Sequence, residues 1–139
     1  MTDGFVADSS VGVRWALPSQ SSQITDHLLL DVASGRPFVV PVLWTFEVAN
    51  SLLVLMRRKR IEPEQCARAR RALSSLTPLV DDEGPRAALG RISDLAEEHA
   101  LSAYDAAYLE LAQRRGLPLA SRDGDLNRAA KRCGIKVLL

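Results

Sequence analysis

Four acidic residues stand where the surrounding sequence is apolar or made of small residues. They are Asp8 directly after FVA, Glu47 in WTFEVAN, Asp105 in SAYDAAYLELA and Asp123 in LASRDGDL. A buried carboxylate without a partner is costly, and no Lys or Arg lies three or four residues from Glu47 or Asp105. A shared Mg²⁺ would satisfy all four, because this hard cation prefers oxygen ligands and keeps water in its shell.

Three of these residues also have a purely structural interpretation. Asp8 and Asp123 each precede an expected helix and can cap it. Ser102 and Asp105 form the S-x-x-D pattern of a capping box. Glu47 lies inside an expected helix between two large apolar residues, where capping does not apply. Capping and metal binding therefore both stay open for Asp8, Asp105 and Asp123.

Short apolar runs typical of strands alternate along the chain with longer helical patterns. Strands are expected at 5–7, 38–40, 79–80, 118–120 and 136–139, and helices at 20–34, 43–59, 63–76, 84–99, 104–114 and 124–132. This alternation predicts a three-layer α/β/α sandwich with a central, mainly parallel sheet. Ligands bind beyond the carboxyl ends of the strands in such sheets, where Asp8 and Asp123 are expected.

The composition is that of an ordinary globular protein. The 139 residues suit a single domain over 1–139, with 47% hydrophobic and 25% charged residues and a net charge of +1. Cys66 and Cys133 lack metal-ligand spacing and are interpreted as reduced thiols. Neither a signal-peptide pattern nor a long apolar run is present, so we expect a cytoplasmic protein without membrane association. The sequence contains no phosphate-binding glycine motif.

Four segments together resemble the PIN-domain family, specifically the VapC-like ribonuclease toxins of type II toxin–antitoxin systems. They are VADSSV, PVLWTFEVANSL, LSAYDAAYLELA and LASRDGDLNRAAKRCGIKVL, in the family's order and spacing over essentially the whole chain. The resemblance implies a PIN-like fold in which the four acidic residues bind Mg²⁺ or Mn²⁺. It adds Asp125 as a further contributor, Ser9 and Ser121 as hydroxyls lining the site, and Asn50 as a polar neighbour of Glu47.

The same resemblance implies the activity and the partners. We expect a metal-dependent endoribonuclease that hydrolyses RNA phosphodiester bonds, forms a homodimer and is blocked by a cognate antitoxin. Bound metal would activate water and neutralise phosphate charge. Two alternatives stay open, a PIN-domain nuclease of RNA processing without an antitoxin and a catalytically inactive binding module of the same fold. A mechanism with two catalytic histidines is disfavoured, because His27 and His99 both fall in ordinary helical patterns.

Basic residues gather between positions 57 and 71, which hold seven of the 18 Lys and Arg residues. This cluster is either a solvated face or a contact for RNA backbone or an acidic partner surface. Arg14, Arg122 and Arg128 lie nearer the acidic motifs and can also contact a substrate. The large aromatic residues at helical positions are expected in the core or a dimer interface rather than stacked on bases; they are Trp15, Trp44, Tyr104 and Tyr108.

Overall fold

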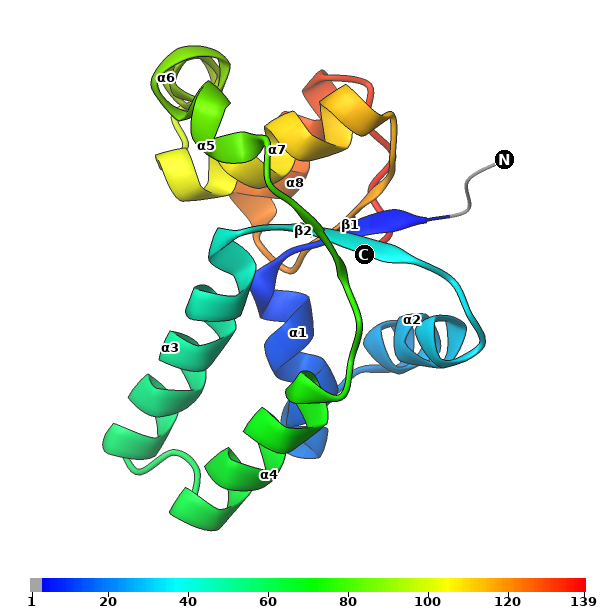
Figure 1. Ribbon diagram of the computed structural model, residues 1–139, viewed down its shortest axis with the longest axis vertical. Coiled ribbons are helices and arrows are strands. Elements are labelled where there is room, and N and C mark those ends of the chain that lie inside the picture. The colour runs from blue at the N-terminus through cyan, green and yellow to red at the C-terminus, as the bar shows by residue number, and fades with distance from the viewer. Residues whose placement is uncertain (1–3) are drawn as a thin grey trace.

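A four-stranded parallel sheet forms the centre of the protein in the computed structural model, which describes residues 4–139 (Figure 1). The strands are β1 (Phe5–Ala7), β2 (Phe38–Pro41), β3 (Leu79–Asp81) and β4 (Leu119–Ala120). Their order is β3-β2-β1-β4, and Val6 pairs with Val39 on one side and with Leu119 on the other. All neighbours are parallel, so the carboxyl ends of the strands meet at one edge.

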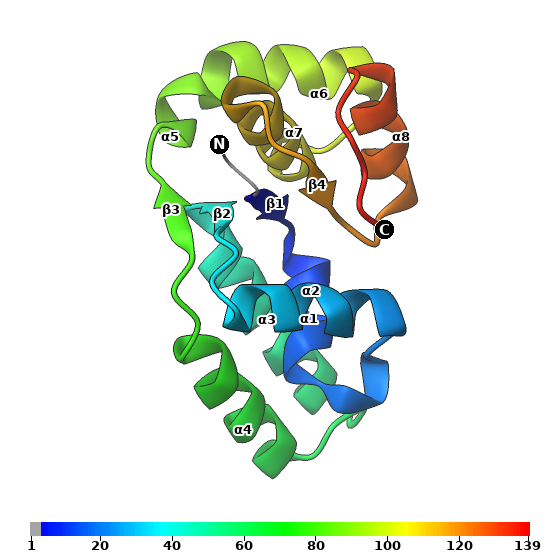
Figure 2. The same cartoon turned by 90° about the vertical axis from the view of Figure 1, so that its right-hand side faces the viewer.

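Helices cover both faces of this sheet (Figures 1 and 2). One layer holds α1 (Ser9–Ala16), α2 (Gln23–Ala33), α3 (Leu43–Arg57) and α4 (Pro63–Ser74). The opposite layer holds α5 (Gly84–Ala87), α6 (Ser93–His99), α7 (Ala103–Arg115) and α8 (Gly124–Arg132). The predicted three-layer α/β/α sandwich is therefore confirmed. Helices α3 and α4 form a hairpin that extends away from the sheet, with the basic residues of 57–60 at its far end.

Local sequence signals explain where several of these elements begin and end. Asp8 caps α1, and Ser22 forms a capping box with Thr25 at the start of α2. Pro63 occupies the first turn of α4, where its missing N–H has no cost. Gly116 ends α7 in the left-handed conformation with φ of 65°, which a residue without a Cβ adopts readily. These boundaries lie close to those expected from the sequence.

Two expected elements differ in the structure. The helix expected at 84–99 is interrupted, because the backbone of Gly90 (φ −117°, ψ −105°) leaves the helical region and a wider π turn occupies Ala88–Ile92. The strand expected at 136–139 is reduced to one bridge between Leu119 and Val137. Both segments have the expected hydrophobic pattern. The backbone of Gly90 interrupts the helix, and β4, with which the last segment pairs, is only two residues long.

An aromatic cluster from β1, α1, β2 and α3 fills the core below the sheet. Trp15 and Phe38 meet edge to face with ring centroids 5.3 Å apart, and Phe38 contacts Trp44 at 5.9 Å. The Trp44 indole N–H also donates to the backbone oxygen of Asp8 at 3.2 Å. The core interpretation of Trp15 and Trp44 is thus confirmed, whereas Tyr104 is 65% exposed.

Cys66 and Cys133 are both free, as expected for reduced thiols. Within residues 4–139, none of the helices combines the length and apolar character that crossing a membrane requires.

Candidate active site

The four acidic residues singled out by the sequence lie at the carboxyl edge of the sheet, and we call them the acidic site. Asp8 follows β1, Glu47 lies in the second turn of α3, Asp105 lies in the first turn of α7, and Asp123 follows β4 as the cap of α8. In addition to burial, the charges of Asp105 and Asp8, which lie close to Glu47, raise its pKa. The charges of Asp123 and Asp8 raise the pKa of Asp105 in the same way. The fold thus brings these distant sequence segments together.

Asp8 is the most buried member of the acidic site, with 4% of its surface exposed. Its Oδ1 accepts hydrogen bonds from Ser10 Oγ at 2.6 Å and from the backbone N–H of Val11 at 3.3 Å. Its Oδ2 accepts a bond of 2.5 Å from Ser121 Oγ. Burial raises the pKa of Asp8, although these hydrogen bonds favour the ionised form. The carboxylate is therefore held in a fixed orientation at an energetic cost.

Glu47 has a neutral partner, Tyr108, whose hydroxyl donates to Glu47 Oε1 at 2.5 Å. Burial raises the pKa of Glu47, the Tyr108 hydrogen bond lowers it, and the nearby charges of Asp105 and Asp8 raise it again. Tyr108 is 1% exposed, and burial beside Glu47 holds the pKa of its hydroxyl well above the ordinary value. The core interpretation of Tyr108 is confirmed, but its role as the partner of Glu47 was missed. Its position three residues after Asp105, on the same face of α7, is the signal that could have found it.

Asp105 and Asp123 combine capping geometry with proximity to the other carboxylates. The N–H of Asp105 donates to Ser102 Oγ at 3.1 Å, and Asp123 Oδ1 accepts from the N–H of Leu126 at 3.1 Å. The pKa of Asp105 is raised by burial, and then by Asp123 and Asp8. The capping interpretation is thus confirmed for Asp8 and Asp123. Capping does not exclude metal binding. The cap of α8 uses only one carboxylate oxygen of Asp123, and the cap of α7 uses the hydroxyl of Ser102 rather than the carboxylate of Asp105.

Residues expected to support the site differ in how closely they approach it. Ser121 is fully buried and links Asp8 to Asp123, because its Oγ also accepts the N–H of Asp123 at 2.9 Å. Ser9 lies close enough to the Tyr108 hydroxyl to lower its pKa. Asn50, in contrast, is exposed, and its side chain makes no hydrogen bond to any residue in the described range 4–139.

Two further polar residues near the acidic site have fixed partners. Asp125 is exposed and forms an ion pair with Arg128. Sequence reasoning missed Ser10, which donates to Asp8 and accepts the backbone N–H of Arg122 at 3.0 Å. Only its position two residues after Asp8 pointed to it.

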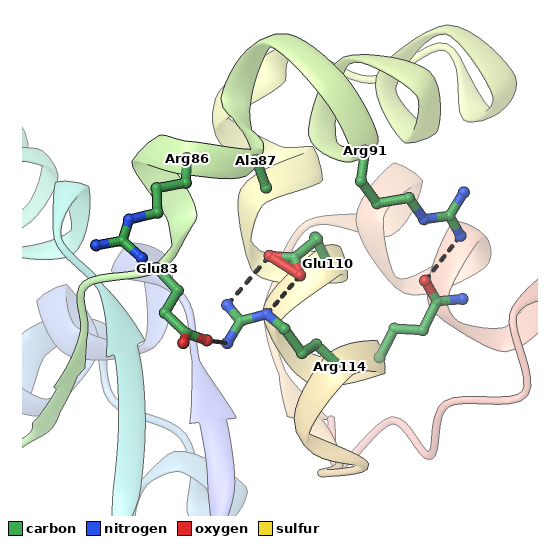
Figure 3. A pocket seen from close by; sticks show the side chains of 7 residues that line it. Glu83, Arg86, Ala87, Arg91, Glu110 and Arg114 are labelled. Carbon is green, nitrogen blue, oxygen red and sulfur yellow. Dashed lines mark hydrogen bonds and ion pairs between the residues drawn. The ribbon is translucent and has the colours of Figure 1, made fainter.

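A second cluster of carboxylates shows what ordinary charge pairing looks like in this protein. Arg114 donates to Asp81, Glu83 and Glu110, and it lines an open pocket between α5 and α7 (Figure 3). Hydrogen bonds from Arg114, and then from Arg115, lower the pKa of Asp81 to about 2. These carboxylates fix β3 and α5 to α7. The acidic site lacks such partners, since none of its members forms an ion pair within residues 4–139.

The donor set of the acidic site suits a hard divalent cation. All four candidate ligands are carboxylates, and three have pKa values raised by burial, a cost that a bound cation would reverse. In the described part of the chain, no three Asp, Glu, His or Cys side chains are close enough to enclose an ion by themselves. This spacing is compatible with Mg²⁺, which commonly binds through one or two carboxylates and retains several waters.

Comparison with known proteins identifies the family. The PIN domain profile matches residues 5–132. Among solved structures, PAE2754 from Pyrobaculum aerophilum has a TM-score of 0.71 and 22% identity, covering 97% of this chain and 83% of its own. FitAcB from Neisseria gonorrhoeae has a TM-score of 0.60 and 18% identity, covering 96% of this chain and 95% of its own. The search of curated proteins found no match. The fold is shared with both structures, and the profile match shows that the chain belongs to the PIN-domain family.

Proposed function

We propose that this protein is a Mg²⁺-dependent endoribonuclease and the toxin of a toxin–antitoxin pair. PIN domains are generally metal-dependent nucleases. The observation that carries the proposal is the acidic site, where four segments contribute carboxylates to one sheet edge without an ion pair in residues 4–139. Keeping such groups together is unfavourable for the protein alone and favourable for cation binding.

Asp8 and Asp105 would be the principal ligands of the cation, with Glu47 and Asp123 completing the site directly or through water. Mg²⁺ or Mn²⁺ bound there would supply an activated water and neutralise charge on the phosphate. Asp8 is already oriented for this role by hydrogen bonds from Ser10 and Ser121. Metal binding therefore requires little reorganisation of this ligand.

Glu47 is suited to orienting the attacking water and accepting its proton. Its Oε1 is occupied by the Tyr108 hydroxyl, which leaves Oε2 for water. The pKa of Glu47 is raised by burial and by neighbouring carboxylates, and a raised carboxyl pKa brings proton acceptance nearer to neutral pH. Tyr108 acts through Glu47 as a positioning residue.

The nuclease proposal is tested by charge-neutralising variants of the ligands. Asp8→Asn and Asp105→Asn should lose Mg²⁺-dependent cleavage of an RNA substrate by at least about a hundredfold, since each removes a metal ligand. The matched control is Asp82→Asn, an exposed residue without an ion pair in the described chain, which should cleave normally. Full activity of Asp8→Asn with a native circular-dichroism spectrum, or full wild-type activity in excess EDTA, would disprove the proposal.

The proposal that this protein is a toxin rests on the sequence resemblance. It includes a cytoplasmic location and an antitoxin partner. A clustered set of unpaired carboxylates is a favourable target for a basic side chain of an inhibitor. Expression of the wild-type chain should arrest growth, Asp8→Asn should not, and a small protein encoded next to the gene should relieve the arrest. Normal growth with active enzyme present would favour an RNA-processing nuclease instead.

The proposed homodimer is supported by large apolar side chains that lie exposed around a groove beside the acidic site. Phe46 is 74% exposed and Tyr104 65% exposed, and both line this groove together with Val42, Leu43 and Pro85. Exposed apolar patches of this kind mark association surfaces. Light scattering should give the mass of a dimer for wild type and that of a monomer for Phe46→Glu. A monomeric wild type at micromolar concentration would refute the association.

A further inference from the structure

Two arginines flank the acidic site on the side of α1 and the β4–α8 turn. Arg14 Nη1 donates to the backbone oxygen of Ser10 at 3.3 Å, and the backbone N–H of Arg122 donates to Ser10 Oγ at 3.0 Å. The same Ser10 hydroxyl donates to Asp8 Oδ1 at 2.6 Å. One serine therefore anchors both arginine segments next to a proposed metal ligand.

Neither of these two arginines forms an ion pair with a carboxylate within residues 4–139. Ion pairs with Asp or Glu are made by Arg36, Arg68, Arg114, Arg115 and Arg128. Within residues 4–139, Arg14 and Arg122 make none. Burial and the charge of Arg122 lower the pKa of Arg14, whereas Asp8 raises it. Two like charges held near each other, neither of them in an ion pair, favour the binding of an anion.

We propose that Arg14 and Arg122 form a phosphate-binding subsite that holds the RNA backbone beside the acidic site. The inference rests on the proposed nuclease function and deepens it. A planar guanidinium stays charged at all physiological pH values and matches phosphate oxygens with two parallel donors. A substrate phosphodiester placed here would also be screened from repulsion by the carboxylates of the acidic site.

The position of the pair favours RNA over an acidic protein as the anion. Both arginine segments are hydrogen-bonded to Ser10, whose hydroxyl donates to Asp8, the most buried carboxylate of the acidic site. An anion bound to the pair would therefore lie close to the proposed metal ligands. The basic cluster of 57–60 lies at the far end of the α3–α4 hairpin instead (Figure 1). We therefore assign Arg14 and Arg122 to direct binding of the substrate strand.

The test is binding of a fluorescent single-stranded RNA in EDTA, which keeps the RNA intact. Arg14→Gln and Arg122→Gln should each weaken binding by roughly tenfold, the usual cost of losing one charged hydrogen bond. Each should also reduce the slope of log Kd against log salt concentration by about 0.7, as expected for one lost phosphate contact on a single strand. The control is Arg36→Gln, which removes the same charge from an arginine paired with Asp31 just before β2, at the amino ends of the strands, and should change Kd less than twofold.

A second arm locates the phosphate. In a series of RNAs that each carry one neutral methylphosphonate linkage at a different position, the wild-type protein should bind more weakly when one particular position is neutralised. The Arg14→Gln/Arg122→Gln double variant should lose nothing further there, because the lost contact is the same. Thermal unfolding of each variant within a few degrees of wild type shows that the fold is kept, and Arg14→Lys should recover part of the affinity.

The outcomes separate this inference from the nuclease proposal. If wild type binds and cleaves RNA while both glutamine variants keep its Kd and salt slope, the subsite is refuted and the nuclease proposal stands. If the variants bind RNA normally but lose binding of an acidic antitoxin segment, the arginines contact protein and the subsite is again refuted. If wild type neither binds nor cleaves RNA, both proposals are wrong.

Discussion

Tyr108 donates a hydrogen bond of 2.5 Å to Glu47 Oε1, joining residues 61 positions apart on α7 and α3. The two helices lie in opposite layers of the sandwich, so this bond crosses the carboxyl edge of the sheet (Figure 1). It holds a half-buried carboxylate in place by means of a neutral donor rather than a cation. The orientation of Glu47 thus depends on the packing of α7, and the charge of Glu47 remains available to a ligand.

Tyr108→Phe tests this relationship. Loss of the hydroxyl should lower the free energy of unfolding by about 1 kcal/mol. The acidic limb of the activity profile should move to higher pH, because the hydrogen bond that lowers the pKa of Glu47 is gone. Cleavage rates between pH 5 and 9 would measure the shift. The matched control, Tyr104→Phe, changes an exposed tyrosine in the same helix. An unmoved pH profile in Tyr108→Phe would show that the hydroxyl does not act on Glu47.

Neutralising carboxylates in the two acidic clusters should have opposite effects on stability. Asp105→Asn should raise the free energy of unfolding of the metal-free protein by roughly 0.5 kcal/mol, because it relieves repulsion from Asp8 and Asp123. Asp81→Asn should lower the free energy of unfolding by roughly 2 kcal/mol. The side chain of Asp81 is 1% exposed, and its neutralisation removes the charged partner of both Arg114 and Arg115. Urea unfolding in EDTA measures both. A destabilised Asp105→Asn would contradict the repulsion argument.

The pH dependence of stability follows from the same contrast. Burial raises the pKa of Asp8, Glu47 and Asp105, so the metal-free protein should lose stability as pH rises from about 4 through those raised pKa values. Asp81 acts in the reverse direction. Its pKa is lowered from 3.8 to about 2, so its contribution is complete above pH 3.8 and is lost as pH falls toward 2.

Stability of the metal-free protein should therefore be greatest at about pH 4 to 5. Urea unfolding from pH 2 to 8 in EDTA would show this maximum. Asp105→Asn should flatten the decline above pH 5, which identifies the acidic site as its source. A stability that rises steadily from pH 5 to 8 would rule this account out.

Mg²⁺ should stabilise the wild-type protein at neutral pH. A ligand at a hundredfold its dissociation constant adds about 2.7 kcal/mol to folding, and here it also cancels repulsion among the carboxylates. Thermal unfolding with and without Mg²⁺ should show a clear rise in midpoint that EDTA reverses. The same addition should have little effect on Asp8→Asn, and an equal rise in that variant would place the cation elsewhere.

Gly12→Ala should damage both packing and the site. A Cβ at Gly12 would approach the Trp44 ring to 2.8 Å and Val48 to 3.0 Å, and Trp44 donates to the backbone of Asp8. Overpacking should cost about 1–2 kcal/mol net, despite the higher helix propensity of alanine. Gly84→Ala is the control, because its nearest neighbour would be Asp81 Oδ2 at 4.0 Å. Unfolding curves and tryptophan fluorescence would report the difference, and equal stability of the two variants would contradict it.

Much of the architecture could be predicted because its signals are local. The apolar triplet before Asp8, the run ending at Pro41 and the helix stop at Gly116 each fix an element within a few residues of the sequence. The alternation of such elements then restricts the topology, and the carboxyl edge follows from it. Local signals placed Asp8 and Asp123 at this edge, whereas Glu47 and Asp105 were grouped with them through the family resemblance.

The features that could not be predicted from the sequence depend on which residues far apart in the chain come into contact. Glu47 has no cation near it in sequence, and nothing along the chain shows that the Tyr108 hydroxyl is its direct partner in the fold. The pairing of Asp81 with Arg114, 33 residues later, is equally invisible along the chain. Gly90 lies in a good helical pattern, but its backbone leaves the helix in the folded protein. These features are set by packing between layers rather than by local preference.

The strand order has a consequence for synthesis of the protein. Among the four strands of residues 4–139, β1 is synthesised first, yet it pairs with β4, which is synthesised last. Until residues 119–123 have emerged, Asp8 lacks the hydroxyl of Ser121 and the acidic site lacks Asp123. A nascent or prematurely terminated chain therefore cannot assemble all four carboxylates. The acidic site is therefore completed late, once β4 and the start of α8 have been synthesised and have packed against β1.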